Sequence, residues 1–434
     1  MNKRKIAYLL SAFVCAGVLS ASLSGCSSSS SSGEETITFI NHKTDWTSNG
    51  KWKEYISEFH RKYPKINVKV QTITDYAGQM KTRMNSKNYG DVFMLPDTVK
   101  AKNYSHYVIS LGSKSELSKK YLGVNSKQYD GKVYGIPSMM NANGIVVNQK
   151  VFDKAGVTEF PTTPEGFVDA LKKVKEKEPK VTPYYTNYAS NWAMANWDFV
   201  RVGASGDPAF NNKLLTDKTP FAKGKVMYQL YNTLYQISKD GLIEKDPTTS
   251  DWEQSKQDLA DGKIGCMVLG SWAIPQIQGK NKSNAKDIKF YAFPMTVDGK
   301  QHASIGADYS LAISRYSSHK KAARTFLNWL VNDSDYAKDN GGISTVKGAA
   351  YPAALQSLKK NNVVLYQAAE APKGKESLLN EINDESEIGL DTTDKTKQQI
   401  VDIGIGNSKQ SFDSLMNQLN KKWGAAVDKV GSGN

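Results

Sequence analysis

The stretch TITFINHKTDWTSNGKWKEYISEFHRKYPKINVKVQTI, residues 36–73, decides the fold of this chain. Residues 36–41 alternate between apolar and polar side chains, which indicates a strand with one buried face. Apolar side chains then recur at helical spacing, as one buried face of a helix requires, at Trp52, Tyr55, Ile56, Phe59 and Tyr63. Pro64 ends this helix, and residues 66–73 alternate again as a second strand.

A helix between two strands makes the chain cross over, which favours parallel pairing of those strands. The sequence GDVFMLP, residues 90–96, adds a short buried strand that ends at a loop. The predicted fold class is therefore α/β, with mostly parallel sheets flanked by helices. In such folds ligands bind beyond the carboxyl ends of the strands.

A strand in the later half of the chain, KIGCMVL at residues 263–269, is followed closely by Trp272 at a Gly-Ser corner. The helix before this strand is predicted to begin with a capping box from Ser250 to Glu253 and to end at Gly262. Trp272 therefore lies where the carboxyl end of a strand meets the next helix. A core tryptophan normally lies inside a helical or strand repeat, so this position suggests a role at the surface of a site.

The N-terminus has the pattern of an export signal. Three cations precede an apolar run, residues 6–19, that is too short to span a bilayer. The sequence LSGC, residues 23–26, resembles the lipobox of bacterial lipoproteins, which implies cleavage before Cys26 and a lipid on its sulfur. Residues 1–25 are then a signal peptide, and residues 26–33 are the lipidated cysteine with a flexible serine linker. An ordinary secretory cleavage site with an incidental cysteine is the alternative.

Composition narrows the classes of function. The chain has 434 residues and a formal charge of +14, and its length suggests two lobes or more. The positive charge is dispersed, and the densest basic run, residues 171–180, contains two glutamates, so no nucleic-acid partner is predicted. With Cys15 and Cys26 in the export segment, Cys266 has no disulfide partner, and its apolar neighbours predict burial.

Motifs for cofactors and covalent chemistry do not occur in the sequence. There is no GxSxG elbow, P-loop, CxxC or HExxH, and the histidines do not show metal-ligand spacing. Neither a cofactor nor a metal is therefore expected.

Several blocks of sequence, taken in order and at plausible spacings, resemble the family 1 extracellular solute-binding proteins that serve carbohydrate ABC importers. These blocks are FHRKYPKINVKVQTI (59–73), GDVFMLP (90–96), DGKVYGIP (130–137), NGIVVNQKVFDKAGV (143–157), LADGKIGCMVLGSWA (259–273) and GADYSLAISRYSSHKKAARTFLNWL (306–330).

The resemblance implies a two-lobed fold like that of the periplasmic binding proteins, with a hinge between the lobes. Such a protein is a receptor rather than an enzyme. It would bind a carbohydrate, a di- or oligosaccharide, between its lobes and deliver it to an ABC permease in the membrane. We expect a monomer held by its lipid on the outer face of the cytoplasmic membrane of a Gram-positive bacterium.

The same resemblance suggests where the lobes divide. Residues 34–141 together with 308–347 are expected to form the N-lobe, and residues 142–307 together with 348–425 the C-lobe. Residues 426–434 are expected to be a disordered tail.

Tryptophans are the first candidates for a sugar site, because a sugar ring has an apolar face that stacks on flat aromatic side chains. Three tryptophans lie within or beside helical repeats and are predicted to be core residues: Trp52, Trp329 and Trp423. Four tryptophans in loops or at helix starts are predicted to bind ligand: Trp46, Trp192, Trp197 and Trp272. Entry of an amphipathic helix is the alternative for Trp192 and Trp197, and packing against the next helix is the alternative for Trp272. Trp252 is expected to pack behind its capping box.

Polar side chains near strand ends and crossovers are the second group of candidates, because hydrogen bonds to charged groups are about twice as strong as neutral ones. The group consists of Asp45, Asp97, Asn141, Asn143, Asp308 and Tyr309. For each residue alone, a structural role in a cap or turn is the alternative.

Two other classes of function remain open at this point. A secreted glycosidase would also combine aromatic platforms with a pair of carboxylates. A surface adhesin would bind carbohydrate without a hinge or a permease partner.

Overall fold

The first sheet of the fold is built around the opening stretch of the chain. In the computed structural model, which describes residues 33–74 and 76–431, this sheet has five strands. Their order is β2 (Ile66–Thr72), β1 (Glu35–Asn41), β3 (Val92–Leu95), β14 (Ser310–Ile313) and β7 (Ile136–Pro137). β1 pairs in parallel with β2 and β3, whereas β14 pairs antiparallel with β3 and β7. The strand–helix–strand unit predicted from the sequence is confirmed.

Two helices supply the core against this sheet, α2 (Lys51–Lys62) and α14 (Lys320–Asn332). The ring of Phe39 on β1 meets Trp52 of α2 edge-on at 5.3 Å and Phe326 of α14 at 5.2 Å. Rings packed in these arrangements contribute about 0.5–1.5 kcal/mol beyond their burial. This packing fixes β1, and with it the loop at its carboxyl end.

The second sheet is also mixed. Its path runs through β12 (Thr296–Val297), β13 (Lys300–Ala307), β8 (Met140–Asn148), β10 (Ile264–Gly270) and β9 (Thr182–Tyr184), with β11 (Ile288–Tyr291) on β8 and β15 (Val364–Gln367) on β13. β10 pairs in parallel with β9 and antiparallel with β8. Every residue of β10 is buried, Cys266 included, as its continuous apolar run predicts.

The core of this second part includes three longer helices, α7 (Pro164–Lys177), α11 (Val226–Lys239) and α19 (Phe412–Gly431). Trp423 of α19 is fully buried, as predicted. The disordered tail expected from residue 426 is wrong for its first residues. α19 continues to Gly431 because Ala426 and Val427 carry its apolar stripe further into the core.

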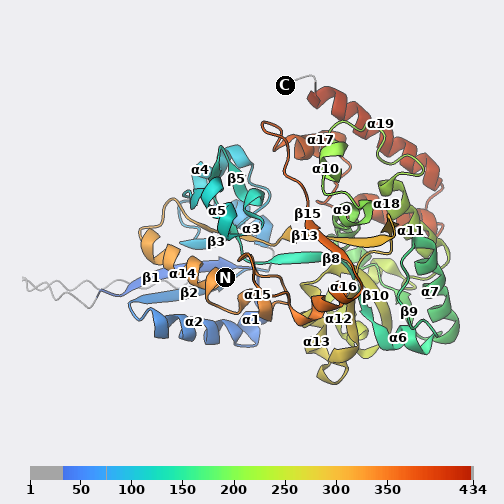
Figure 1. Cartoon of the computed structure of the whole chain (residues 1–434), viewed down its shortest axis with the longest axis horizontal. Helices are drawn as coiled ribbons and strands as arrows, with labels where there is room; N and C mark the ends of the chain where they lie inside the picture. Colours follow the sequence, from blue (N-terminus) through green and yellow to red (C-terminus); the bar gives the residue numbers. More distant parts are fainter. Residues whose placement is uncertain (1–32, 75, 432–434) are drawn as a thin grey trace, which may run out of the picture. The chain divides into compact units, whose positions relative to one another are not determined.

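The chain passes between the two sheets between β7 and β8 and again between β13 and β14. The strands β8 and β13, which pair with each other, are labelled in Figure 1. A later segment lies beside the first passage, because Met140 and Ile343 exchange backbone hydrogen bonds of 2.8 and 2.7 Å. These neighbouring passages are where a hinge would act. The residue numbers of the two lobes remain a prediction.

The remaining elements are short helices and one small sheet. Their helices are α1 (Thr44–Ser48), α3 (Tyr76–Arg83), α4 (Tyr104–Tyr107), α5 (Lys114–Lys120), α6 (Gln149–Lys154), α8 (Asn196–Phe199), α9 (Arg201–Ser205), α10 (Phe210–Leu214), α12 (Trp252–Asp261), α13 (Ala273–Lys280), α15 (Tyr336–Asp339), α16 (Gln356–Lys360), α17 (Leu378–Ser386) and α18 (Lys395–Gly404). A small sheet joins β4 (Gly112–Ser113), β6 (Lys132–Val133) and β5 (Gln128–Tyr129). Within the described ranges, no helix has both the length and the apolar character to cross a membrane.

Candidate ligand-binding site

The carboxyl end of β1 forms one side of the candidate site. The backbone N–H of Lys43 donates a hydrogen bond of 2.8 Å to Oδ1 of Asn41, the last residue of the strand. This side-chain turn leads directly into α1. It places the side chains of Lys43 and Asp45 just beyond the sheet edge, where the parallel strands β1 and β3 end.

Three of the predicted polar residues meet in one cluster beside this loop. Nδ2 of Asn141 donates to Oδ2 of Asp308 at 2.9 Å, and the N–H of Tyr309 donates to Oδ1 of Asp308 at 2.6 Å. The ring of Tyr309 packs against His42, with centroids 4.7 Å apart. Oδ1 of Asn141 is buried and has no hydrogen-bond partner among the described residues. A buried acceptor without a partner is costly, so this atom is suited to receive a ligand hydroxyl.

The charges in this loop are strongly influenced by burial. Burial lowers the pKa of His42 to about 4, while the negative charge of Asp308 opposes the shift. His42 is therefore a neutral imidazole at neutral pH. Burial also lowers the pKa of Lys43, again opposed by carboxylates, here Asp45 and Asp308. His42 and Lys43 are not among the predicted site residues, although both follow β1 as Asp45 does.

Three tryptophans form the aromatic part of the site. The ring of Trp192 lies 5.0 Å from that of Trp252 and 5.7 Å from that of Trp272, and the rings of Trp252 and Trp272 are 5.7 Å apart. Trp192 is 40% exposed, so the cluster reaches solvent. The ammonium group of Lys256 lies 4.9 Å from the ring centroid of Trp252. Trp252 was expected only to pack behind a helix cap, and the structure adds it to the cluster.

The corner at Trp272 has a clear local cause. A Cβ at Gly270 would lie 2.4 Å from Nε1 and 2.5 Å from Cδ1 of Trp272, so the indole folds back over the glycine. Ser271 is fully buried, and its Oγ accepts a hydrogen bond of 3.1 Å from the N–H of Ala142 on β8. Glycine gives the ring its space, and serine ties the turn to the sheet. Trp272 directly precedes α13, which confirms its predicted position between strand and helix.

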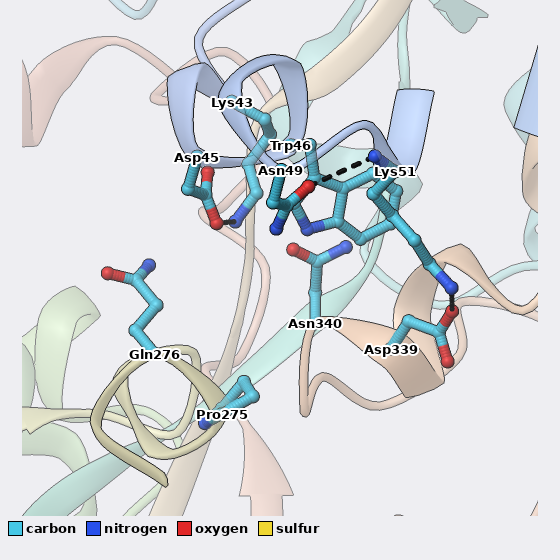
Figure 2. A pocket seen from close by; sticks show the side chains of 9 residues that line it. All are labelled: Lys43, Asp45, Trp46, Asn49, Lys51, Pro275, Gln276, Asp339 and Asn340. Carbon is cyan, nitrogen blue, oxygen red and sulfur yellow. Dashed lines mark hydrogen bonds and ion pairs between the residues drawn. The ribbon is translucent and has the colours of Figure 1, made fainter. Parts of the chain in front are cut away.

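A polar pocket of about 260 Å³ includes Lys43 and Asp45 of the loop after β1 (Figure 2). Its lining residues are Lys43, Asp45, Trp46, Asn49, Lys51, Pro275, Gln276, Asp339 and Asn340. An ion pair of 2.9 Å joins Lys51 to Asp339. Oδ1 of Asn340 is buried and has no hydrogen-bond partner among the described residues. The pocket therefore brings the loop after β1 together with the first turn of α13.

Trp46 enters this pocket only with a small part of its ring. It is 5% exposed and packs against Trp52, Tyr55 and Tyr336, with centroids 4.9 to 5.2 Å apart. Its neighbour Asp45 is exposed and lies 3.9 Å from the ammonium group of Lys43. The two predicted residues are thus close to the polar cluster, but Trp46 is mainly a core residue.

One predicted ligand contact is corrected by the structure. Trp197 is fully buried, and its Nε1 donates a hydrogen bond of 2.8 Å to the hydroxyl of Tyr184. Its ring also meets Phe293 edge-on at 5.4 Å. Because no face of the indole is open, Trp197 stabilises the core and does not present a surface to a ligand.

Two further predicted residues lie outside the clusters described so far. Asp97 is exposed and forms an ion pair with Lys127. Nδ2 of Asn143 on β8 donates to Oγ of Ser304 at 3.3 Å, and the same hydroxyl donates to the carbonyl of Phe199 at 3.3 Å. Phe199 is 37% exposed, so Ser304 links Asn143 to the backbone of another exposed aromatic residue.

Comparison with known proteins adds to this geometry. Residues 43–337 match the family model described as bacterial extracellular solute-binding protein. A manno-oligosaccharide-specific solute-binding protein from Bifidobacterium animalis subsp. lactis, solved with mannotriose, is 39% identical to this chain, with a TM-score of 0.87. The match covers 91% of this chain and 95% of that one.

Two more proteins are similar over most of their length. A binding protein of an ABC transporter from the same organism, solved with mannobiose, is 38% identical, with a TM-score of 0.86 and the same coverage of both chains. A multiple sugar-binding protein from Streptococcus mutans is 26% identical over 326 residues, which cover 72% of this chain and 76% of that protein.

Proposed function

This chain belongs to the bacterial extracellular solute-binding proteins, and on that premise we propose that it is the oligosaccharide receptor of an ABC transporter, with a short manno-oligosaccharide as its ligand. The similarity to two manno-oligosaccharide-binding structures at 38–39% identity over 91% of the chain supports this ligand class. A solute-binding protein binds its ligand without transforming it, so the glycosidase alternative is set aside.

The tryptophan cluster is the observation that carries the proposal. The exposed ring of Trp192, supported by Trp252 and Trp272, offers a flat apolar surface for the C–H face of a sugar. The hydroxyl rim needs charged or amide partners, which Asp308 and Asn141 supply. Aromatic platforms beside a few convergent polar groups are typical of small-molecule sites.

The charge of Lys43 is influenced by both the polar cluster and the tryptophan cluster. Burial lowers the pKa of Lys43; the carboxylate of Asp308, in the polar cluster, opposes this shift, and the ammonium group of Lys256, which lies over the ring of Trp252, adds to it. Lys43 is therefore within electrostatic reach of both groups, at the pocket between the loop after β1 and α13.

Anchoring and motion extend the proposal. Cys26 would carry a lipid that holds the receptor at the outer face of the membrane, beside its permease; this residue lies outside the described ranges. Residues 34–141 with 308–347 would rotate against residues 142–307 with 348–425 when the ligand binds. The paired backbone at Met140 supports a hinge there.

Calorimetry with a defined sugar panel tests the ligand class. Mannose, mannobiose, mannotriose, cellotriose and raffinose are titrated into the mature protein, and thermal unfolding is measured with each sugar. We expect saturable binding of mannobiose and mannotriose and a ligand-dependent rise in the unfolding temperature. A folded protein that ignores both manno-oligosaccharides, or that prefers cellotriose or raffinose, would contradict the proposal. Small-angle scattering with and without the tightest ligand then tests lobe closure.

A further inference from the structure

The segment that carries Trp192 has little regular structure. It runs from Tyr185 to Ala195, between β9 and α8, and contains only two short 3-10 turns. Asn187 and Asn191 adopt left-handed backbone conformations, with φ of 55° and 60°. Non-glycine residues hold such conformations only where the surroundings fix them. The question is which side chains hold this segment in place.

Glu244 fixes the start of the segment. Its side chain is buried, and both of its carboxylate oxygens accept hydrogen bonds from the N–H of Thr186, at 3.1 and 2.8 Å. The hydroxyl of Thr186 also donates to Oε1 of Glu244, and the same hydroxyl accepts from the N–H of Tyr188 at 3.1 Å. One carboxylate therefore organises the turn that precedes Trp192.

A serine holds the middle of the segment. The N–H of Ala189 donates to Oγ of Ser250 at 2.8 Å. Ser250 was expected to cap α12, but the cap is Asp251, which accepts from the N–H of Gln254 at 2.7 Å. The shift by one residue leaves the serine hydroxyl available to the segment.

A second carboxylate holds the end of the segment. The buried side chain of Asp394 accepts from the N–H of Met194 at 3.2 Å and from that of Ala195 at 2.9 Å. Buried carboxylates thus hold the backbone before and after Trp192, and its ring has the contacts with Trp252 and Trp272 described above.

We propose that Glu244 is a positioning residue for the sugar-binding platform: its carboxylate sets the Thr186 turn, and through it the place of the Trp192 ring. The inference rests on the proposed function for its binding readout. Hydrogen bonds to a charged carboxylate are stronger than neutral ones, and a buried N–H left without an acceptor is costly. Without the carboxylate, the left-handed residues would relax and the Trp192 ring would leave its neighbours.

Titration of Glu244 gives this role a pH signature. Burial raises the pKa of Glu244 to about 7, while the hydrogen bonds from Thr186 oppose the shift. Below that pH the carboxyl takes up a proton, and one of its acceptor positions becomes a donor. It can then no longer accept all the hydrogen bonds from Thr186, so sugar affinity should fall as the pH falls through 7.

The other titratable groups that face Glu244 do not change the direction of this pH dependence of sugar affinity. They are the phenols of Tyr184 and Tyr185, whose pKa values burial raises, so both are neutral in this range. The Cys266 thiol beside Tyr184 is neutral for the same reason. The negative charges of Asp251 and Asp258 raise the pKa of Tyr185 further.

Fold stability should respond to pH in the opposite direction. The folded pKa of Glu244 lies above the value of 4.5 for an unperturbed glutamate, so the folded state binds the proton more tightly than the unfolded state. Acidification from pH 7 towards 4.5 therefore stabilises the fold through this group, while it weakens the platform. A purely structural role would move affinity and stability together.

The test uses Glu244→Gln and Glu244→Asp in the mature protein, with mannotriose Kd and unfolding temperature measured from about pH 5.5 to about pH 8.5. We expect the wild-type Kd to rise about tenfold from the alkaline to the acidic end, a flat and weak Kd for Glu244→Gln, and partial rescue by Glu244→Asp. The matched control is Asp217→Asn. The Asp217 carboxylate forms an ion pair of 2.7 Å with Lys225, and its removal should leave the pH dependence of Kd as in the wild type. Equal Kd values and equal profiles for wild type and Glu244→Gln would overturn the inference.

A double-mutant cycle and a ligand-free measurement separate this inference from the proposed function. In a Trp192→Ala background, Glu244→Gln should have no further effect on Kd, and a full additive loss would contradict a route through Trp192. The ligand-free measurement is tryptophan fluorescence as a function of pH. The difference between the wild type and Trp192→Phe, which reports on Trp192, should change with a midpoint near pH 7, and Glu244→Gln should abolish that change. If the wild type binds no oligosaccharide, the proposed function fails, and this pH transition alone decides the inference. If Glu244→Gln does not fold, the pH dependence of the wild-type Kd decides the inference about Glu244.

Discussion

Replacing Trp272 by alanine separates a ligand platform from a core residue. The indole is partly exposed and makes two ring contacts, with Trp192 and Trp252, both at 5.7 Å. Aromatic pairs contribute about 0.5–1.5 kcal/mol each beyond area burial, so the loss of two pairs predicts a cost of roughly 1–3 kcal/mol in the free energy of unfolding. The fully buried Trp197 should cost more, about 3–5 kcal/mol on the scale of Trp→Ala core substitutions.

Binding should suffer as well as the fold. Stacking of a flat ligand on an aromatic side chain is worth about 1–3 kcal/mol, taking nucleic-acid bases as the analogy. Since every 1.4 kcal/mol is tenfold in Kd, Trp272→Ala should weaken oligosaccharide binding by roughly five-fold to more than a hundred-fold. Loss of Trp272 also removes a neighbour of Trp192, which favours the upper part of this range.

The assay is calorimetry with mannotriose together with urea unfolding, on Trp272→Ala and on Trp197→Ala as the core control. We expect a large loss of affinity with modest destabilisation for Trp272→Ala. Trp197→Ala should show the larger loss of stability. The reasoning is refuted if Trp272→Ala keeps the wild-type Kd while its unfolding midpoint falls as far as that of the Trp197 variant.

Further predictions concern the corner, the buried charges and the anchor. Gly270→Ala should weaken sugar binding, with a loss of stability no larger than that of Trp272→Ala, because the new methyl would lie 2.4 Å from Trp272 and displace its ring; an unchanged Kd would show that the ring position is not required. Lys397→Met should destabilise the fold by about 3–5 kcal/mol in urea unfolding, because Asp198, fully buried and 2.6 Å from the lysine, would lose the partner of its ion pair. A loss under about 1 kcal/mol would mean that water or relaxation compensates the charge. Cys26→Ala should give an exported, unanchored protein that still binds sugar, and a wild type that takes up no labelled lipid would contradict the anchor.

Local periodicity was enough to predict the elements that position the site. The alternation in residues 36–41 and the helical stripe at Trp52 and Phe59 lead directly to β1, α2 and their packing. The continuous apolar run before Gly270 indicates a strand buried on both faces, and β10 is buried throughout. The sequence pattern therefore predicts where β1 and β10 end. Trp272 and the loop that holds Asp45 directly follow these strand ends.

The exposure of each side chain could not be predicted in the same way. Trp192 and Trp197 lie five positions apart in one mixed polar and aromatic segment, yet one is 40% exposed and the other fully buried. The difference arises from tertiary contacts: Trp197 donates a hydrogen bond to the hydroxyl of Tyr184, and the ring of Trp192 packs against that of Trp252. Neither contact leaves a periodic signal. The same reason explains why Trp252 was missed and why α19 continues past its expected end.

The two halves of the site are built differently, and this has a consequence for specificity. Asp308 and Asn141 are held by strand ends and by the passage between the sheets, so a change there also alters the region in which a hinge would act. Trp192 is held by an irregular segment whose backbone depends on side-chain acceptors from Glu244 and Asp394. Substitutions in that segment can move the ring without breaking a sheet. In this chain, a substitution in the aromatic segment should therefore change the preferred sugar while the polar cluster stays unchanged.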